Sequence, residues 1–99
     1  MIVKVHRSRE GKRIISICDK EIIGKKFSEK NKQLDLSSNF YKGEEKTEEE
    51  VRELVKDAYI LNIVGECSIE FCLKERWISK NNIIRIKKMP HAQCLFITD

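Results

Sequence analysis

The sequence predicts an α+β fold in which a mainly antiparallel β-sheet carries two helices on one face. Short segments that alternate polar and apolar residues lie near both ends of the chain, and a long helical repeat lies in the middle. The expected order is ββ-ββ-αα-ββ, that is, two hairpins, two helices and a final pair of strands. The 99 residues match the common size of one domain, so we expect a single domain over 1–99.

A β-hairpin is expected at the N-terminus. Residues 1–7 alternate polar and apolar side chains as a strand does, and residues 13–18 return in the same way. The segment 8–12 between them contains a glycine, which suits a tight turn. Residues 19–24 follow as a turn or a single helical turn, with Asp19 as its cap.

A second hairpin is expected between residues 25 and 37. Its alternation directs Leu34 and Leu36 toward the core. The loop that follows contains Phe40 and Tyr41. Adjacent exposed aromatic residues are uncommon without a partner, so we expect this pair to anchor the loop on the body of the protein.

The longest periodic segment, residues 47–65, predicts the central helix, because its apolar residues recur every three or four positions. Thr47 and Glu50 have the spacing of a capping box at its start. Gly65 suits its end, since glycine readily adopts a positive φ. The half over 59–64 is apolar almost all round, so we expect a helix that is buried on every side.

The C-terminal third predicts a shorter helix over 66–77 and then two strands. A turn at 79–82 leads into a strand at 83–86. A bend at 87–90 contains the single proline of the chain, and the closing strand is expected at 91–97.

The charge of the chain is small but unevenly distributed. There are 20 Lys and Arg against 16 Asp and Glu, for a net charge of +4. Residues 1–43 hold 11 basic and 5 acidic residues, whereas residues 44–58 hold 3 basic and 7 acidic ones. A basic N-terminal half favours an anionic partner on one face, although ordinary solubility explains the same pattern.

Composition and cysteine spacing argue against a membrane span and a metal centre. No signal peptide and no apolar run long enough to cross a bilayer is present, so we expect a cytoplasmic protein with no membrane association. No CxxC pair occurs, and cysteines five positions apart on a helix point in different directions. We therefore predict no metal site and no cofactor, and the redox state of the thiols stays open. The four thiols are Cys18, Cys67, Cys72 and Cys94.

Two groups of polar residues are candidates for a ligand site. His91 and Gln93 alternate on one strand and so share a face, which makes a binding pair of an imidazole and an amide; a solvent-facing strand end gives the same pattern. Asn62 falls on the inward face of the expected helix, where it needs a hydrogen-bond partner, either structural or functional. Gly65 and Glu66 mark a helix–helix corner whose free N–H groups attract anions, although such corners also serve as plain helix ends.

Basic residues concentrate on the two predicted hairpins. If the hairpins adjoin, these residues form a positive stripe suited to a nucleic-acid backbone; a solvated lysine-rich surface is the alternative. No aromatic RNA-binding pattern, helix-turn-helix or zinc knuckle accompanies them. The candidates for nucleic-acid contact are Arg7, Arg9, Lys12, Arg13, Lys25 and Lys26.

Several short motifs resemble the archaeal family catalogued as domain of unknown function 424. They are Asn62-Ile-Val-Gly65-Glu66 with Ser68, Gly24-Lys25 with Phe27, and Pro90-His91-Ala92-Gln93. The resemblance covers nearly the whole chain and implies an archaeal, cytosolic, stand-alone α+β protein without an established activity. It adds Ser68 to the candidate ligand-binding residues and assigns no catalytic residue.

Three functions follow as hypotheses. The first is a non-enzymatic binding module that contacts RNA or a translation-associated protein through the basic hairpins. The second is a small-ligand-binding protein or an enzyme with a pocket near Asn62, Glu66, His91 and Gln93. The third is a subunit that binds protein through an exposed apolar patch around Tyr59, Ile63 or Trp77. The sequence leaves catalysis and the oligomeric state open.

Overall fold

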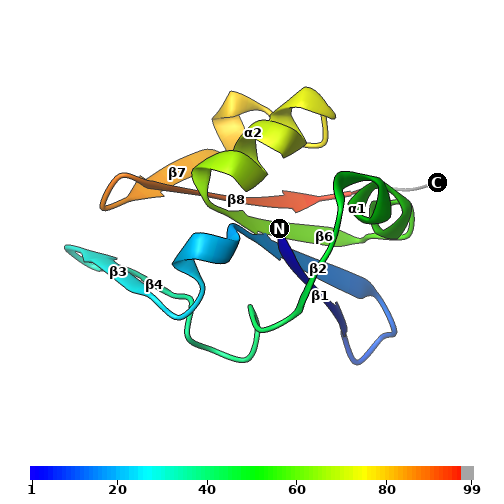
Figure 1. Cartoon of the computed structure of the whole chain (residues 1–99), viewed down its shortest axis with the longest axis horizontal. Coiled ribbons are helices and arrows are strands. Elements are labelled where there is room, and N and C mark those ends of the chain that lie inside the picture. The colour runs from blue at the N-terminus through cyan, green and yellow to red at the C-terminus, as the bar shows by residue number, and fades with distance from the viewer. Residues whose placement is uncertain (97–99) are drawn as a thin grey trace.

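The computed structural model describes residues 1–96 and has an α+β architecture. A six-stranded sheet has the strand order β5-β1-β2-β6-β8-β7, and β3 and β4 form a separate two-stranded sheet (Figure 1). The strands are β1 (Ile2–Arg7), β2 (Arg13–Cys18), β3 (Lys26–Glu29), β4 (Lys32–Asp35), β5 (Glu44–Glu45), β6 (Ile60–Val64), β7 (Ile83–Ile86) and β8 (Met89–Leu95). The helices are α1 (Glu48–Val55) and α2 (Glu66–Lys74), with short 3-10 turns η1 (Lys20–Ile22) and η2 (Lys80–Asn82).

The sheet is mainly antiparallel and carries both helices on one face, as the sequence predicts. Among its strand pairs only β2 and β6 run parallel within the described residues. The larger cluster of buried apolar side chains lies between the sheet and the helices, and it contributes most of the burial that stabilises the fold. Its members include Val3, Ile15, Ile17, Val51, Val55, Leu61, Ile63, Ile69, Phe71 and Ala92.

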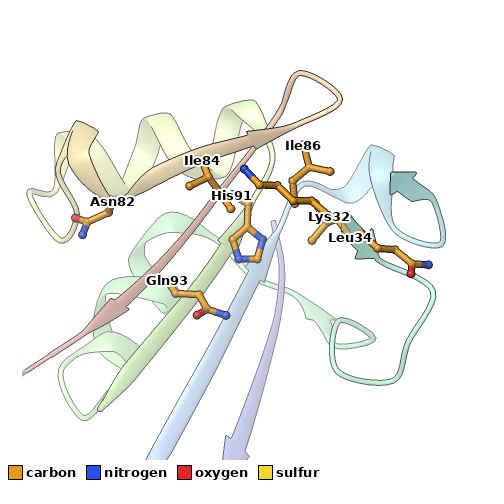
Figure 2. A pocket seen from close by; sticks show the side chains of 8 residues that line it. Lys32, Leu34, Asn82, Ile84, Ile86, His91 and Gln93 are labelled. Carbon is orange, nitrogen blue, oxygen red and sulfur yellow. The ribbon is translucent and has the colours of Figure 1, made fainter. Parts of the chain in front are cut away.

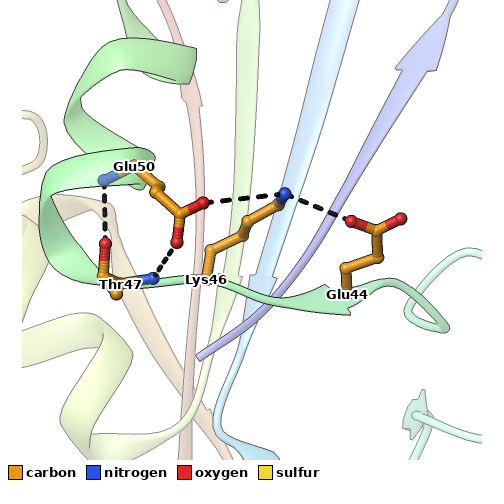
Figure 3. A network of polar contacts seen from close by, with 4 residues as sticks. All are labelled: Glu44, Lys46, Thr47 and Glu50. Atoms are coloured by element: carbon orange, nitrogen blue, oxygen red, sulfur yellow. Dashed lines mark hydrogen bonds and ion pairs between the residues drawn. The ribbon is translucent and has the colours of Figure 1, made fainter.

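Helix α1 begins at the predicted capping box. Thr47 Oγ1 accepts a hydrogen bond from Glu50 N at 3.1 Å, and Thr47 N donates to Glu50 Oε1 at 3.0 Å (Figure 3). Lys46, just before the cap, forms two ion pairs: its Nζ lies 3.1 Å from Glu44 Oε2 and 3.9 Å from Glu50 Oε2. These contacts fix the start of the helix and link it to edge strand β5.

The prediction of one long helix over 47–65 is wrong in its second half. Helix α1 ends at Val55, and Ile60–Val64 forms the strand β6 in the middle of the sheet. An apolar run of this length suits a strand covered on both faces as well as a buried helix, and its Ile and Val residues favour the strand. β6 pairs with β2 in parallel and with β8 antiparallel. The two helices, expected to be consecutive, are therefore separated along the chain by the most buried strand.

The hairpins appear where the sequence predicts them. The β3–β4 hairpin lies on the sheet face opposite the helices (Figure 1), and Leu34 and Leu36 are buried there. They join a second apolar cluster with Val64, Ile86 and Tyr41. The face opposite the helices is the second face of the sheet. This cluster covers one end of it, and within residues 1–96 no α-helix covers the rest.

The final hairpin is tighter than predicted. Lys87 and Lys88 both have positive φ, of 52° and 70°, which is the geometry of a two-residue hairpin turn. The closing strand therefore begins at Met89 and includes Pro90. The expected end of that strand at residue 97 lies outside the described residues. Helix α2 also ends earlier than expected, at Lys74.

Candidate ligand-binding groove

The two faces of the sheet differ in chemistry because β6 alternates. Leu61 and Ile63 face the helices, whereas Asn62 points to the second face. In the register of the sheet, Asn62 lies between Ser16 on β2 and Gln93 on β8. The second face therefore has a row of polar residues across three neighbouring strands.

Asn62 has a structural partner. The Tyr41 hydroxyl donates a hydrogen bond to Asn62 Oδ1 at 3.1 Å, and both residues are buried. Burial raises the pKa of Tyr41 to about 12, so the phenol keeps its proton at neutral pH. The neighbouring Phe40 stacks on His6 at 4.3 Å between ring centroids, and its carbonyl accepts from Ser16 Oγ at 3.0 Å. The aromatic loop is thus anchored over the centre of the second face, as expected.

His91 and Gln93 share the second face, as strand alternation predicts, and both line a groove between two hairpins (Figure 2). One side of the groove is β4, and the other is the β7–β8 hairpin. Its volume is about 430 Å³, which is within the range of small-ligand sites. The lining residues are Lys32, Gln33, Leu34, Asn82, Ile84, Ile86, His91 and Gln93.

The groove combines a cation, amides and an imidazole. Among the described residues, Lys32 is the one charged side chain in its lining, and it extends from β4 toward Ile84 and His91 (Figure 2). His91 Nδ1 is buried and has no hydrogen-bond partner among the described residues. Burial lowers the pKa of His91, which favours the neutral imidazole. The groove therefore offers hydrogen-bond donors and acceptors above an aliphatic floor, and no carboxylate of residues 1–96 lines it.

The surroundings of the groove are strongly basic. The β3–β4 segment, residues 25–36, has four lysines and two acidic residues, and residues 80–93 have four basic residues and no acidic one. One of the acidic residues, Glu29, accepts a hydrogen bond from Lys87 N at 3.0 Å, which joins the tips of the two hairpins. The net positive charge of the chain is thus concentrated on the two segments that form the groove.

The corner between β6 and α2 already contains an anion, which is the carboxylate of Asp19. Its Oδ1 accepts from Ser68 N at 2.8 Å and from Ser68 Oγ at 2.6 Å, and its Oδ2 accepts from Cys67 N at 3.1 Å. The prediction that Asp19 caps the 19–24 turn is wrong, because its side chain makes no cap there and instead caps α2, which follows β6. An external anion would have to displace this carboxylate.

Gly65 makes that cap possible. Its φ is 111°, and a Cβ there would lie 2.3 Å from Asp19 Cγ, which no side chain permits. Glu66 is exposed and its Oε1 pairs with Arg85 Nη1 at 2.8 Å on the helix side of the sheet. The predicted ligand residues therefore separate into two groups: Asn62, His91 and Gln93 on the second face, and Gly65, Glu66 and Ser68 at the helix corner.

The two basic hairpins do not adjoin. The turn between β1 and β2 and the β3–β4 hairpin lie at opposite ends of the molecule (Figure 1). Within the first hairpin, Arg13 pairs with Asp57 at 3.2 Å, and Lys12 Nζ lies 4.0 Å from the Tyr59 ring centroid. The first four nucleic-acid candidates thus lie far from the groove, whereas Lys25 and Lys26 belong to the hairpin that forms one of its sides.

The remaining candidates from the sequence are the apolar patch and the cysteines, and neither forms a site within residues 1–96. Ile63 is fully buried, and Tyr59 and Trp77 are half-buried, so these three residues form no exposed apolar patch. All four cysteines are unpaired thiols. Within residues 1–96 no cluster of three His, Cys, Asp or Glu side chains has metal-site geometry, and no helix there is long and apolar enough to span a bilayer.

Sequence reasoning missed Gln33, Asn82 and Ile84 as lining residues of the groove. They come from segments about 50 residues apart that meet only because β4 folds over β7. The signal available in the sequence was the concentration of lysines and amides on the same two hairpins.

Comparison with known proteins supports the fold and the family. The chain is similar to the crystal structure of an uncharacterized conserved protein from Methanopyrus kandleri, with a TM-score of 0.78 and 19% identity over 99% of this chain and 94% of that chain. This likeness concerns the fold alone. No curated protein matched the sequence. The family model described as Protein of unknown function (DUF424) matches residues 6–97, and the chain therefore belongs to that family.

Proposed function

We propose that this protein is a non-enzymatic binding module that holds a segment of single-stranded RNA in the groove between β3–β4 and β7–β8. The observation that supports it most is the charge of the groove. Basic residues outnumber acidic ones by eight to two on the two segments that form it, and Lys32 is the one charged residue that residues 1–96 contribute to its lining. Basic surroundings of this kind bind phosphate groups, because each contact between a basic side chain and a phosphate releases bound counterions.

The groove lining suits a nucleobase as well as a phosphate. Protein recognition of single-stranded RNA uses hydrogen bonds to base edges and contacts with base faces. Gln33, Asn82 and Gln93 supply amide donors and acceptors, and neutral His91 supplies one of each. Ile84 and Ile86 provide an aliphatic surface for a base face. A volume of about 430 Å³ accommodates one nucleotide, so the rest of the strand would follow the basic rim.

A binding role agrees better with the groove than catalysis does. His91 and Gln93 share it with Lys32, but the lining that the described part of the chain provides contains no carboxylate or thiol to act with the imidazole. Asn62 is engaged with Tyr41, and Glu66 pairs with Arg85 on the other side of the sheet. We expect the RNA to belong to the translation machinery, and the family resemblance favours an archaeal cytoplasm as its location.

Fluorescence anisotropy with a labelled oligouridylate of about 10 nucleotides tests the proposal. We expect binding that weakens steeply between about 50 and 200 mM salt. Lys32→Glu and the double variant Lys25→Glu/Lys26→Glu should each weaken it by about tenfold or more, because each places a carboxylate beside the RNA backbone.

The double variant Arg7→Glu/Arg9→Glu is the matched control, since it makes the same change of charge at the far end of the molecule. We expect an effect of about twofold or less at moderate salt, because screening is strong over this distance. An equal loss in this control would refute the groove as the site. Binding that is insensitive to salt would refute an RNA-backbone contact altogether.

A further inference from the structure

A second groove lies on the helix side of the sheet, between α2 and β7. Its floor is apolar, with Ile69 and Leu73 from the helix and Ile83 from the strand. Its volume is about 510 Å³. At one end, the ion pair between Glu66 and Arg85 spans from helix to strand. This groove does not share its lining with the groove proposed for RNA.

Strand β7 borders this groove with an unpaired edge. It is the last strand of the sheet, and within residues 1–96 its ladder partner is β8 alone. Ile86 and Met89 flank a two-residue turn, so their backbone groups pair with each other, and pairing alternates along the strand. Arg85 therefore directs its N–H and C=O away from β8. The bond from Gly65 N to the carbonyl of Pro90, the residue opposite Arg85, is consistent with this alternation.

An unpaired edge beside an apolar groove is the geometry in which peptides add as an extra strand. The peptide backbone pairs with the edge, and every second side chain enters the groove. Here alternate side chains would reach the floor formed by Ile69, Leu73 and Ile83.

The charge of β7 and its flanks selects the occupant. Residues 80–88 contain four basic residues and no acidic one. A second copy of the chain would bring two such segments together, and like charges on paired strands are destabilising. Arg85 is already paired with Glu66, and Glu70 also lines the groove. The attraction for an acidic segment therefore comes mainly from Lys80, Lys87 and Lys88. Its carboxylates must lie on the side of the strand away from Glu66 and Glu70.

We infer that β7 and α2 form a docking site for an extended acidic segment of a partner protein, which adds as a strand to the edge of β7 and places apolar side chains against Leu73. The side chains of such a strand alternate, so its acidic residues point to the second face of the sheet, near Lys32. The inference does not depend on RNA binding.

Amide hydrogen exchange with a synthetic probe tests this inference. The probe is a peptide of about eight residues that alternates valine and aspartate, long enough to cover β7. We expect it to slow exchange of the Arg85 amide by about tenfold or more, because that N–H gains a partner. The amides of Ile84 and Ile86, which already pair with β8, should change little. A peptide that alternates valine and lysine should give no protection.

Two Leu→Glu variants provide the matched comparison. Leu73→Glu places a carboxylate on the groove floor and should abolish the protection, whereas Leu95→Glu makes the same change on the second face, at a side chain 54% exposed, and should preserve it. Arg85→Pro removes the donor itself, which an edge strand tolerates, and should also abolish binding.

Three results would overturn the inference. They are the absence of binding at millimolar peptide, protection that appears at the amides of His91 and Gln93 instead, and protection of Arg85 at high protein concentration without peptide, which would identify a second copy as the occupant.

Discussion

The two faces of the central sheet are built from the same strands but have different roles. On the helix face, Ile15, Ile17, Leu61 and Ile63 are fully buried, and the helices cover them completely. On the second face, the alternate positions hold polar residues such as Ser16, Asn62 and Gln93, and a single hairpin and a loop cover part of it. The comparison indicates that one face carries most of the stability and leaves the other available for recognition.

The largest expected effect comes from truncating a side chain on the helix face. Ile63→Ala should reduce the free energy of unfolding by about 2–5 kcal/mol, because it leaves a cavity in a closed core. Ile84→Ala, at a side chain 47% exposed on the second face, should cost about 1 kcal/mol or less. Urea denaturation followed by circular dichroism measures both. Similar losses for the two variants would contradict the assignment of stability to one face.

Loss of the internal anion should come next. Asp19→Ala removes the acceptor of three hydrogen bonds at the start of α2 and should lower the free energy of unfolding by about 2–3 kcal/mol. Asp57→Ala is the control, since that carboxylate is 72% exposed in its pair with Arg13 and should contribute less than about 1 kcal/mol. The denaturant midpoint of each variant, measured by urea denaturation, tests whether Asp19→Ala loses more stability than Asp57→Ala. Equal shifts would mean that the cap adds little to α2.

A smaller effect is expected where the second face is sealed. Tyr41→Phe deletes the hydroxyl that donates to Asn62 and leaves a buried amide oxygen without that donor. We expect a loss of about 1 kcal/mol in the free energy of unfolding, with RNA affinity in the groove unchanged. Thermal melting and the anisotropy assay measure the two quantities. A loss of RNA affinity without loss of stability would instead place Asn62 in the ligand site.

The smallest effect concerns pH. Burial lowers the pKa of His91 below 6.5, so the unfolded chain binds a proton more readily than the folded one. The contribution of His91 to stability is therefore fully present above about pH 6.5 and decreases as pH falls toward the folded pKa. The difference in free energy of unfolding between wild type and His91→Gln, measured from about pH 7.5 to 5, should show this slope. A difference that is constant with pH would argue against a buried neutral imidazole.

Local patterns predicted the hairpins and the polar pair, because those signals depend on near neighbours in sequence. Leu34 and Leu36 are buried, and His91 and Gln93 share a face, as alternation requires. The identity of β6 was missed, because a short apolar run has no period that separates a buried strand from a buried helix. Only its partners β2 and β8 decide that it is a strand.

Only one side of the candidate groove could be predicted from the sequence, for a similar reason. The polar residues of β8 could be recognised, but the opposite side of the groove comes from β4, far away in sequence. The role of Asp19 was hidden in the same way, since its acceptor oxygens bind amides 48 and 49 residues later. Interactions of this kind become predictable only when the topology is known.

The contact between Asp19 and the first turn of α2 has a consequence for how the chain folds. Because the cap comes from the end of β2, the start of α2 acquires its full stability only after the N-terminal hairpin has reached its place beside β6. The first hairpin and the second helix should then open and close as one cooperative unit, although half the chain separates them. Contacts of such long range slow the search for the native state, so assembly of this corner is expected to be a late event in folding.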